Sequence, residues 1–292
     1  MKVAVFGSGG YIGRHLVVRL RRDGAAVVPF SSADPGVFDP VTGLLLDGVI
    51  LPADTDTVVF LSQSPRFRQM PDEASHLWSV NVLSAMRAAK LARQSGVGRF
   101  VYASTGNVYA PSFEAMDESR PLRRDDWYAL SKVHAEEALA LYNSDMQVLS
   151  ARIFGVYGPG QTDRLVPNLV QSLRGGNSVT LASRADGVQD DGGLRVSLCF
   201  IHDVVDIFAH LVGQGTAGAI NIAGPHAVSI GDVAAAIGRL IGRPARFELA
   251  SQPRRFDLIA DVTKLVQLCR PQFTPFETGL RAMLGPQQAC QA

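Results

Sequence analysis

Two residues of one predicted helix carry side chains that can move a proton. Tyr128 and Lys132 are four residues apart in a segment with helical periodicity, 127–142, so both side chains face the same way. A free tyrosine has a pKa of about 10 and is a weak base at neutral pH, whereas a neighbouring ammonium favours the phenolate and lowers that pKa. The pair is therefore suited to general acid–base chemistry. Taken alone, the same spacing also fits a solvated helix face.

Hydroxyl groups at the end of an earlier predicted strand could join this pair. The strand 99–103 runs into Ser104 and Thr105. Hydroxyls at the carboxyl end of a parallel strand lie where such sheets bind their ligands, so one of them could hold a substrate oxygen. The alternative is a Ser/Thr turn that only ends the strand.

A glycine-rich turn near the N-terminus predicts a dinucleotide site. It follows the first predicted strand, 3–6, and opens the predicted helix 12–22. Glycine permits the tight turn and the close approach of a diphosphate, and the helix N-terminus presents N–H groups to negative charge. The alternative is an ordinary glycine-rich turn. The residues expected to contact the dinucleotide are Gly7, Gly10, Tyr11, Ile12 and Gly13.

The end of the second predicted strand, 26–30, bears on the choice between NAD and NADP. An acidic residue at this place usually binds the adenosine ribose hydroxyls of NAD. Here Ser31 and Ser32 follow the strand, and the first acid is Asp34. Serine hydroxyls can hydrogen-bond a 2′-phosphate, so the sequence favours NADP, with Arg14 as the source of positive charge. The alternative is that Asp34 reaches back to the ribose and the cofactor is NAD.

The order of the predicted elements places these residues on a Rossmann-like fold. Apolar runs typical of strands buried on both faces alternate with helical segments. We predict an α/β protein with a doubly wound parallel sheet in residues 1–160, to which 196–225 contribute, and a smaller C-terminal substrate-binding lobe in 161–292. The pattern in 31–52 supports no firm prediction. The predicted strands are 3–6, 26–30, 57–62, 99–103, 147–153 and 219–222, and the predicted helices are 12–22, 77–95, 127–142, 165–174 and 229–241.

Composition narrows the classes of function. A net charge of +1 over 292 residues provides no general attraction for nucleic acid or a membrane surface. Cys199, Cys269 and Cys290 are too far apart for a metal-binding motif or a disulfide framework, which fits a reducing compartment. We therefore expect a cytoplasmic protein with no bound metal, no nucleic-acid partner and no membrane association.

Together, the motifs resemble those of one family. Gly-x-x-Gly-x-x-Gly at 7–13, Ser-Thr-x-x-Val-Tyr at 104–109 and Tyr-x-x-x-Lys at 128–132 resemble the extended short-chain dehydrogenases. This family includes sugar-nucleotide epimerases, dehydratases and 4-ketoreductases. The segments that extend the resemblance over most of the chain are 80–82, 152–160, 200–204 and 220–224.

The resemblance implies roles for single residues. Thr105 would hold the reacting oxygen, Tyr128 would act as the acid/base, and Lys132 would bind the nicotinamide ribose and tune the phenol. The helices 77–95 and 127–142 would form a homodimer interface. The cofactor contacts would include Ser31, Ser32 and Asn81, and the substrate contacts would be Thr105, Asn107, Arg254 and Arg255. The arginines resemble a late family arginine that meets a substrate diphosphate, and the alternative is a solvated surface pair.

Departures from the family pattern narrow the reaction. Gly106 and Asn107 stand where the 4,6-dehydratases carry an acid pair, so dehydratase chemistry is disfavoured. What remains is 4-epimerisation, or reduction of a 4-keto group, on a nucleotide-activated sugar. Gly155 stands where many epimerases carry an asparagine that touches the substrate, which leaves the sugar open. The alternatives are a reductase of a non-sugar ketone or aldehyde and a nucleotide-sensing protein without turnover.

Overall fold

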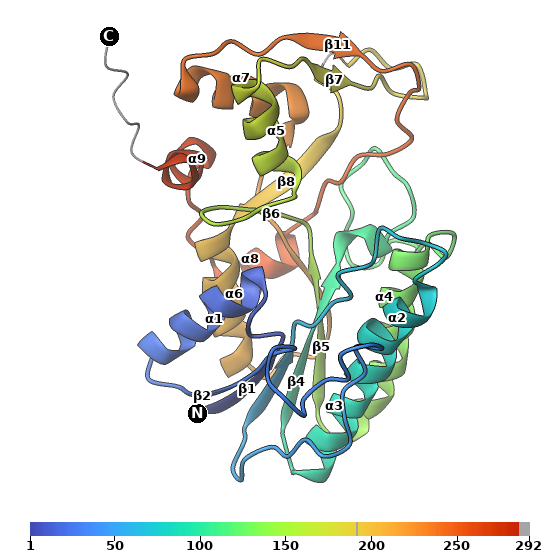
Figure 1. Cartoon of the computed structure of the whole chain (residues 1–292), viewed down its shortest axis with the longest axis vertical. Helices are drawn as coiled ribbons and strands as arrows, with labels where there is room; N and C mark the ends of the chain where they lie inside the picture. The colour runs from blue at the N-terminus through green and yellow to red at the C-terminus, as the bar shows by residue number, and fades with distance from the viewer. Residues whose placement is uncertain (191, 286–292) are drawn as a thin grey trace. The chain divides into compact units, whose positions relative to one another are not determined.

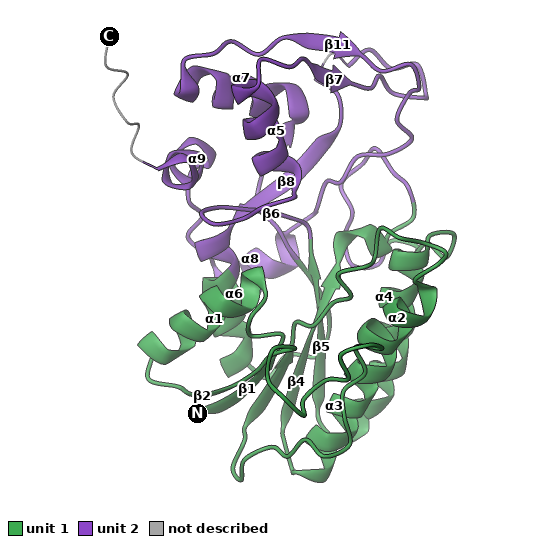
Figure 2. Cartoon of the chain, viewed as in Figure 1, with its two compact units in different colours: residues 1–110, 120–153, 205–221 green, residues 111–119, 154–204, 222–292 purple. Residues whose placement is uncertain are grey.

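The computed structural model (Figure 1) describes residues 1–190 and 192–285, so Cys290 lies outside the described residues. The chain divides into two compact units, which Figure 2 shows in different colours. Unit 1 comprises residues 1–110, 120–153 and 205–221, and unit 2 comprises 111–119, 154–204 and 222–292. Each unit therefore combines segments that are far apart in the sequence.

A parallel sheet forms the centre of unit 1. Its strand order is β2-β1-β3-β4-β5-β9, and neighbouring strands from β2 to β5 are parallel. The strands are β1 (Lys2–Phe6), β2 (Ala26–Phe30), β3 (Thr57–Phe60), β4 (Arg99–Thr105), β5 (Gln147–Ile153) and β9 (Gly218–Ile222). This order confirms the predicted doubly wound, Rossmann-like class, in which β1 lies next to both β2 and β3.

Helices cover both faces of this sheet. They are α1 (Tyr11–Arg22), α2 (Ala74–Trp78), α3 (Ala85–Gln94), α4 (Trp127–Ala140) and α6 (Ile201–Gly213). In Figure 1, α1 and α6 lie over one face, and α2, α3 and α4 lie over the other. Arg19 of α1 donates to Asp206 of α6 at 2.5 Å. Because both faces are covered, all four residues of β3 are buried, as the continuous apolar run predicted.

Two parts of unit 1 differ from a regular alternation of strands and helices. Residues 31–56, all of them described, add no strand to the large sheet and form turns with an isolated bridge between Phe38 and Leu45. The predicted helix 77–95 is divided into α2, a π-helical turn (Ser79–Ser84) and α3. Because a π-helical turn holds one residue more than an α-helical turn, α2 and α3 turn different sides toward the sheet than they would in one regular helix.

Unit 2 contains two small sheets among its described residues, in the orders β10-β8-β6 and β11-β7. Its elements are β6 (Gly155–Tyr157), α5 (Leu165–Arg174), β7 (Val179–Leu181), β8 (Arg195–Phe200), β10 (Ala227–Ser229), α7 (Ile230–Ile241), β11 (Phe247–Leu249), α8 (Thr263–Cys269) and α9 (Phe276–Leu284). Ser229 and Asp232 form a capping box at the start of α7. Within 1–190 and 192–285, none of the helices has the length and apolar character needed to cross a bilayer.

Candidate active site

The glycine turn lies at the switch point of the large sheet. The chain leaving β1 enters the crevice between the ends of its two neighbours, where doubly wound sheets bind ligands. Gly7 has a φ of +82°, and a Cβ there would lie 2.7 Å from the backbone nitrogen of Ser62. A Cβ on Gly13 would lie 2.2 Å from the carbonyl oxygen of Gly7. Neither position accommodates a side chain, because neighbouring backbone fills the space, so the tight turn and the close packing of α1 on it require glycine at both places.

Helix α1 begins directly after this turn without a side-chain cap. Its N-cap is Gly10, so the first-turn N–H groups have no side-chain acceptor and can bind an anion. Tyr11 and Ile12, in the first turn, are half-buried. The Tyr11 hydroxyl has no hydrogen-bond partner among the described residues, and burial raises the pKa of Tyr11 to about 12. These features fit the diphosphate of a dinucleotide.

The residues after β2 form a small turn closed by a carboxylate. Asp34 accepts a hydrogen bond from the backbone nitrogen of Ser31 at 2.7 Å, while Ser31 Oγ accepts one from the backbone nitrogen of Ala33 at 3.0 Å. Ser32 is exposed. Asp34 therefore does reach back to the end of β2. The guanidinium of Arg14 lies over the ring of Tyr11, 5.2 Å from its centroid.

Strand β4 extends to Thr105 and presents its hydroxyl at the carboxyl end of the sheet. Thr105 Oγ1 accepts a hydrogen bond from the backbone nitrogen of Asn107 at 3.2 Å and caps a short 3-10 helix, Gly106–Val108. This bond uses an acceptor site only, so the hydroxyl proton can still be donated to a ligand. The hydroxyl of Ser104 donates instead to the carboxylate of Glu136.

Helix α4 brings Tyr128 and Lys132 to the ends of two different strands. The hydroxyl of the half-buried Tyr128 donates a hydrogen bond to Gln63 Oε1 at 3.0 Å, and Gln63 lies in the loop after β3. Lys132 Nζ donates to the carbonyl oxygen of Ala103 in β4 at 2.8 Å. This hydrogen bond holds the amine of Lys132 against β4, at the residue two positions before Thr105.

Burial gives Lys132 an unusual electrostatic environment. Its side chain is 2% exposed, and Nζ lies 4.7 Å from the centroid of the Tyr102 ring. Desolvation lowers the pKa of Lys132 to about 7, and the negative charge of Glu136, one helical turn later, opposes this shift. Burial also raises the pKa of Tyr102 well above its usual value. A pKa near neutrality allows the amine to gain or lose a proton under working conditions.

A buried ion pair connects α4 to β5. Arg152 Nη2 and Glu136 Oε2 are 2.7 Å apart, and both side chains are almost completely buried. Arg152 Nη1 donates to the hydroxyl of Tyr109 at 3.0 Å, and that hydroxyl donates to Asn221 Oδ1 at 2.6 Å. Sequence reasoning did not identify Glu136, Arg152 or Asn221 as part of this support. The available signal was that Glu136 follows Lys132 by four residues, on the same helix face.

The π-helical turn positions Asn81, which is fully buried. Its Oδ1 accepts a hydrogen bond from the backbone nitrogen of Ser64 at 3.1 Å, and its Nδ2 donates to Ser131 Oγ at 3.0 Å. Its carbonyl oxygen accepts the hydroxyl of Tyr102 at 3.0 Å. Asn81 thus joins the loop after β3 to α4 and β4. Direct contact between Asn81 and a cofactor stays a prediction.

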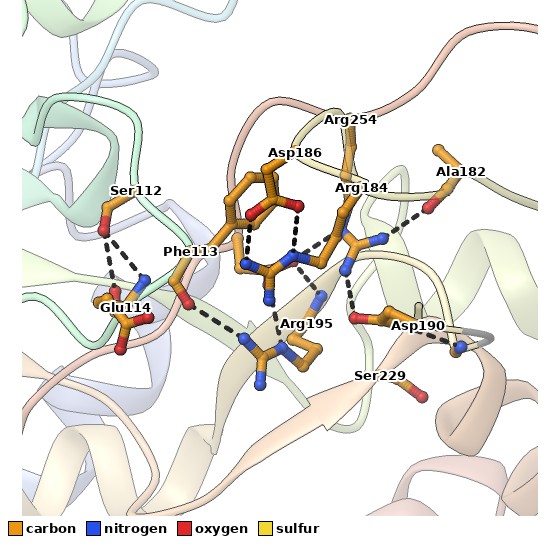
Figure 3. Close-up of polar contacts among 12 residues, drawn as sticks. Ser112, Phe113, Glu114, Ala182, Arg184, Asp186, Asp190, Arg195, Ser229 and Arg254 are labelled. Carbon is orange, nitrogen blue, oxygen red and sulfur yellow. Dashed lines mark hydrogen bonds and ion pairs between the residues drawn. The ribbon is translucent and has the colours of Figure 1, made fainter. Parts of the chain in front are cut away.

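The two late arginines of unit 2 occupy different environments. Arg254 is 9% exposed, and Figure 3 shows its guanidinium among polar groups that it binds. It donates to Asp257 Oδ1 at 2.9 Å, to Asp190 Oδ2 at 2.5 Å and to the carbonyl oxygen of Ala182 at 2.6 Å. Arg255 is exposed. A solvated surface position therefore describes Arg255 and is wrong for Arg254.

Two further arginines of unit 2 lie around Phe113, as Figure 3 shows. Arg195 donates to Asp257 Oδ2 at 2.9 Å and to the carbonyl oxygen of Phe113 at 3.0 Å. The guanidinium of Arg184 stacks on the Phe113 ring at 4.0 Å and is paired with Asp186. Neither arginine was selected from the sequence as a substrate contact. Because each guanidinium is paired with a carboxylate, an anionic ligand must compete with these acids.

One enzyme family matches most of the chain. Residues 3–223 match the model of the NAD dependent epimerase/dehydratase family. The chain belongs to this family. The match confirms the resemblance to the extended short-chain dehydrogenases, and it makes the protein an enzyme of the NAD(P)-dependent epimerase and reductase class. No group of three or more His, Cys, Asp and Glu side chains in the described residues could hold a metal ion.

Relatives within the NAD dependent epimerase/dehydratase family match almost the whole chain. UDP-glucose 4-epimerase of Mycolicibacterium smegmatis is 27% identical over an aligned length of 279 residues, and the alignment covers 88% of each protein. dTDP-4-dehydro-6-deoxy-D-allose reductase of Streptomyces bikiniensis is 27% identical over an aligned length of 314 residues, and the alignment covers 95% of this chain and 93% of the relative. The structure of MoeE5 in complex with UDP-glucose and NAD is 26% identical, with a TM-score of 0.78 and 97% of both chains covered.

Proposed function

We propose that this enzyme acts at C4 of a nucleotide-activated sugar, as a 4-epimerase or a 4-ketoreductase. The observation that carries the proposal is the placement of Thr105, Tyr128 and Lys132. Lys132 is hydrogen-bonded to β4 two residues before Thr105, and Tyr128 lies one helical turn before Lys132 on α4. The named activities of two relatives, a 4-epimerase and a 4-keto sugar reductase, support the same choice.

The residues present fit a nicotinamide dinucleotide. The turn of Gly7, Gly10 and Gly13 would hold its diphosphate at the start of α1, because the first N–H groups of this helix have no side-chain cap. Lys132 and Asn81 would hold its nicotinamide end. When bound, the nicotinamide would accept or donate the hydride of the reaction.

The protein's own groups would handle the proton. Tyr128 would take the proton that the C4 hydroxyl loses when it becomes a carbonyl, and would return it in the opposite direction. Thr105 would donate a hydrogen bond to the same oxygen, since its cap uses only an acceptor site. Gly106 and Asn107 supply no acid or base, so the proposed reaction does not eliminate water.

We propose NAD as the cofactor, in place of the NADP that Ser31 and Ser32 favoured. The carboxylate of Asp34, hydrogen-bonded to the backbone nitrogen of Ser31, would repel the 2′-phosphate of NADP and can accept hydrogen bonds from ribose hydroxyls. The structure of MoeE5, a 26% identical protein, is described as a complex with NAD, which supports the same choice.

We propose that Arg254 and Arg255 contact the diphosphate of the substrate, and that Asn107 contacts its sugar. A guanidinium suits a diphosphate because it donates parallel hydrogen bonds. Asp190 and Asp257 fix the orientation of the Arg254 guanidinium, and a substrate diphosphate would compete with these two carboxylates for it. Arg255 is exposed and would add positive charge.

We also propose that the enzyme is a homodimer. Large apolar side chains are exposed on the neighbouring helices α3 and α4 and just beside them. They are Leu83, Met86, Trp127 and Leu141. A second copy of the same surface would bury them around a two-fold axis. In analytical ultracentrifugation, Met86→Glu should shift the protein toward the monomer, and an unchanged dimer would exclude this surface.

One experiment tests the proposed reaction directly. Purified enzyme is incubated with a panel of UDP-, dTDP- and GDP-linked sugars and their 4-keto forms, with NAD or NADP(H), and products are identified by mass spectrometry and NMR. We expect C4 inversion or 4-keto reduction with at least one nucleotide sugar. Tyr128→Phe should lose turnover and keep its affinity for the cofactor, and full turnover in this variant would reject the mechanism.

A further inference from the structure

The acid–base tyrosine has a polar neighbour that its sequence motif does not contain. The hydroxyl of Tyr128 donates to the side-chain oxygen of Gln63 at 3.0 Å. Gln63 comes from the loop after β3, 65 positions earlier in the chain, and its side chain is half-buried. The ring of Phe67 lies against Tyr128 with its centroid 5.3 Å away. The loop therefore contacts both the ring and the hydroxyl of this tyrosine.

The loop that carries Gln63 is fixed by the residue beside it. Ser64 is fully buried, its backbone nitrogen donates to Asn81 Oδ1 at 3.1 Å, and its hydroxyl lies 2.8 Å from His76 Nδ1. Asn81 in turn donates to Ser131, whose hydroxyl donates to the carbonyl oxygen of Tyr128 at 2.8 Å. A continuous set of buried and partly buried hydrogen bonds thus links the backbone of the loop to the backbone of α4. This arrangement keeps the amide of Gln63 at a set distance from the phenol.

A carboxamide can serve a phenol in both of its protonation states. Its oxygen accepts the hydrogen bond of the neutral phenol, as it does here, and its NH2 group can donate to the phenolate after a half-turn of the amide. We propose that Gln63 is a positioning residue that holds the Tyr128 hydroxyl in place and stabilises it as phenol and as phenolate. The inference rests on the proposed function in one respect only, namely that Tyr128 is the group that exchanges the proton.

Other titratable groups near Tyr128 come from the elements packed around it. Tyr102 of β4 interacts with it electrostatically, Lys132 and Glu136 follow it on α4, and Arg68 of the loop stacks on Phe67. A test must therefore change Gln63 and leave these groups in place. Gln63→Glu does so, because it keeps the size of the side chain and adds one negative charge beside the phenol.

The experiment is a spectroscopic titration of Tyr128 in the whole protein, without substrate. Phenolate absorbance in the near-ultraviolet is followed against pH for the wild-type protein and for Gln63→Glu. The same titration in the Tyr128→Phe background is subtracted, which removes the other five of the 6 tyrosines. Gln69→Glu, at an exposed position of the same segment, is the matched control for added charge.

We expect Gln63→Glu to raise the pKa of Tyr128 by about one unit or more, since a carboxylate at hydrogen-bond distance opposes the phenolate. Gln69→Glu should shift it by less than about a third of a unit. Gln63→Met should also raise the pKa, because an apolar neighbour solvates the phenolate poorly, and this neutral variant decides the question if Gln63→Glu does not fold. Titrations of both Gln63 variants that superimpose on the wild type would overturn the proposal.

The titration separates this inference from the proposed reaction because it needs no substrate. A nucleotide-sugar panel without turnover would count against the proposed function and leave the pKa comparison intact. Conversely, C4 turnover with unshifted Gln63 variants would support the reaction and reject the role of Gln63.

Discussion

In the cofactor-free protein, Lys132→Met should remove a gain in stability that the wild type shows between neutral and alkaline pH. Lys132 is 2% exposed, and burial lowers its pKa from an ordinary value of 10.5 to about 7. The unfolded chain keeps the ordinary value, so it binds more protons than the folded chain between these two pH values. The free energy of unfolding therefore rises with pH between about 7 and 10.5. As the pH falls from 10.5 to 7, the wild-type protein loses this gain in stability.

The size of this effect follows from the pKa difference. Since one pKa unit corresponds to about 1.4 kcal/mol, the lysine contributes roughly 5 kcal/mol over the whole window. About 2 kcal/mol of this should appear between about pH 7 and pH 9. Loss of the hydrogen bond to Ala103 costs the variant about 1 kcal/mol at every pH, which changes the level of its stability and leaves the slope unaffected.

Urea unfolding of both proteins without cofactor, at about pH 7 and about pH 9, measures this difference. Groups that titrate in both proteins cancel when the two pH dependences are subtracted. Lys90→Met, at an exposed position of α3, is the control and should follow the wild type. Parallel pH dependences for the wild type and Lys132→Met would show that the buried amine is not desolvated as the structure indicates, and would refute the reasoning.

Three further substitutions test other parts of the site. Glu136→Gln leaves Arg152 as an unpaired buried charge and should lower the free energy of unfolding by about 3–5 kcal/mol in urea, whereas the exposed neighbour Glu137→Gln should change it by less than about 0.5 kcal/mol. Gly13→Ala places a methyl group against the backbone of the turn and should weaken NAD binding at least tenfold in calorimetry; wild-type affinity would exclude a diphosphate at this turn. Asp34→Asn should lower the preference for NAD over NADP about tenfold in paired binding measurements, and an unchanged ratio would reject the role of this carboxylate.

Elements with a long, regular pattern were predicted well from the sequence. The strand 147–153 and the helix 165–174 have the predicted bounds, because burial of both faces makes the strand a mostly apolar run and burial of one face gives the helix a 3.6-residue period. Strands β6, β7, β10 and β11 have three residues each, which is too short for an alternation to be seen. The π-helical turn was also missed, since one wider turn leaves the composition of the segment unchanged.

The residues of the candidate site also differ in how well the sequence predicts them. Motif residues such as Gly7, Thr105 and Tyr128 have local signals, because a turn, a strand end or a helical spacing places them. Gln63 and Arg195 contact their partners only through the tertiary fold, and the hydrogen bond from the backbone nitrogen of Ser31 to Asp34 depends on the shape of one turn. Composition and periodicity contain no information on contacts that depend on the tertiary fold or on the shape of a single turn.

The wide turn at Ser79–Ser84 has a consequence for how this enzyme tolerates changes in length. A π-helical turn accommodates one residue more than an α-helical turn, and such turns occur frequently at functional sites. Deleting a single residue there would restore a regular helix at little cost in helix stability, but it would rotate α2 relative to α3 by roughly a quarter-turn or more. Asn81 would then lose its hydrogen bonds to Ser64, Ser131 and Tyr102. We therefore expect a one-residue deletion in this helix, which lies outside the sheet, to inactivate the enzyme.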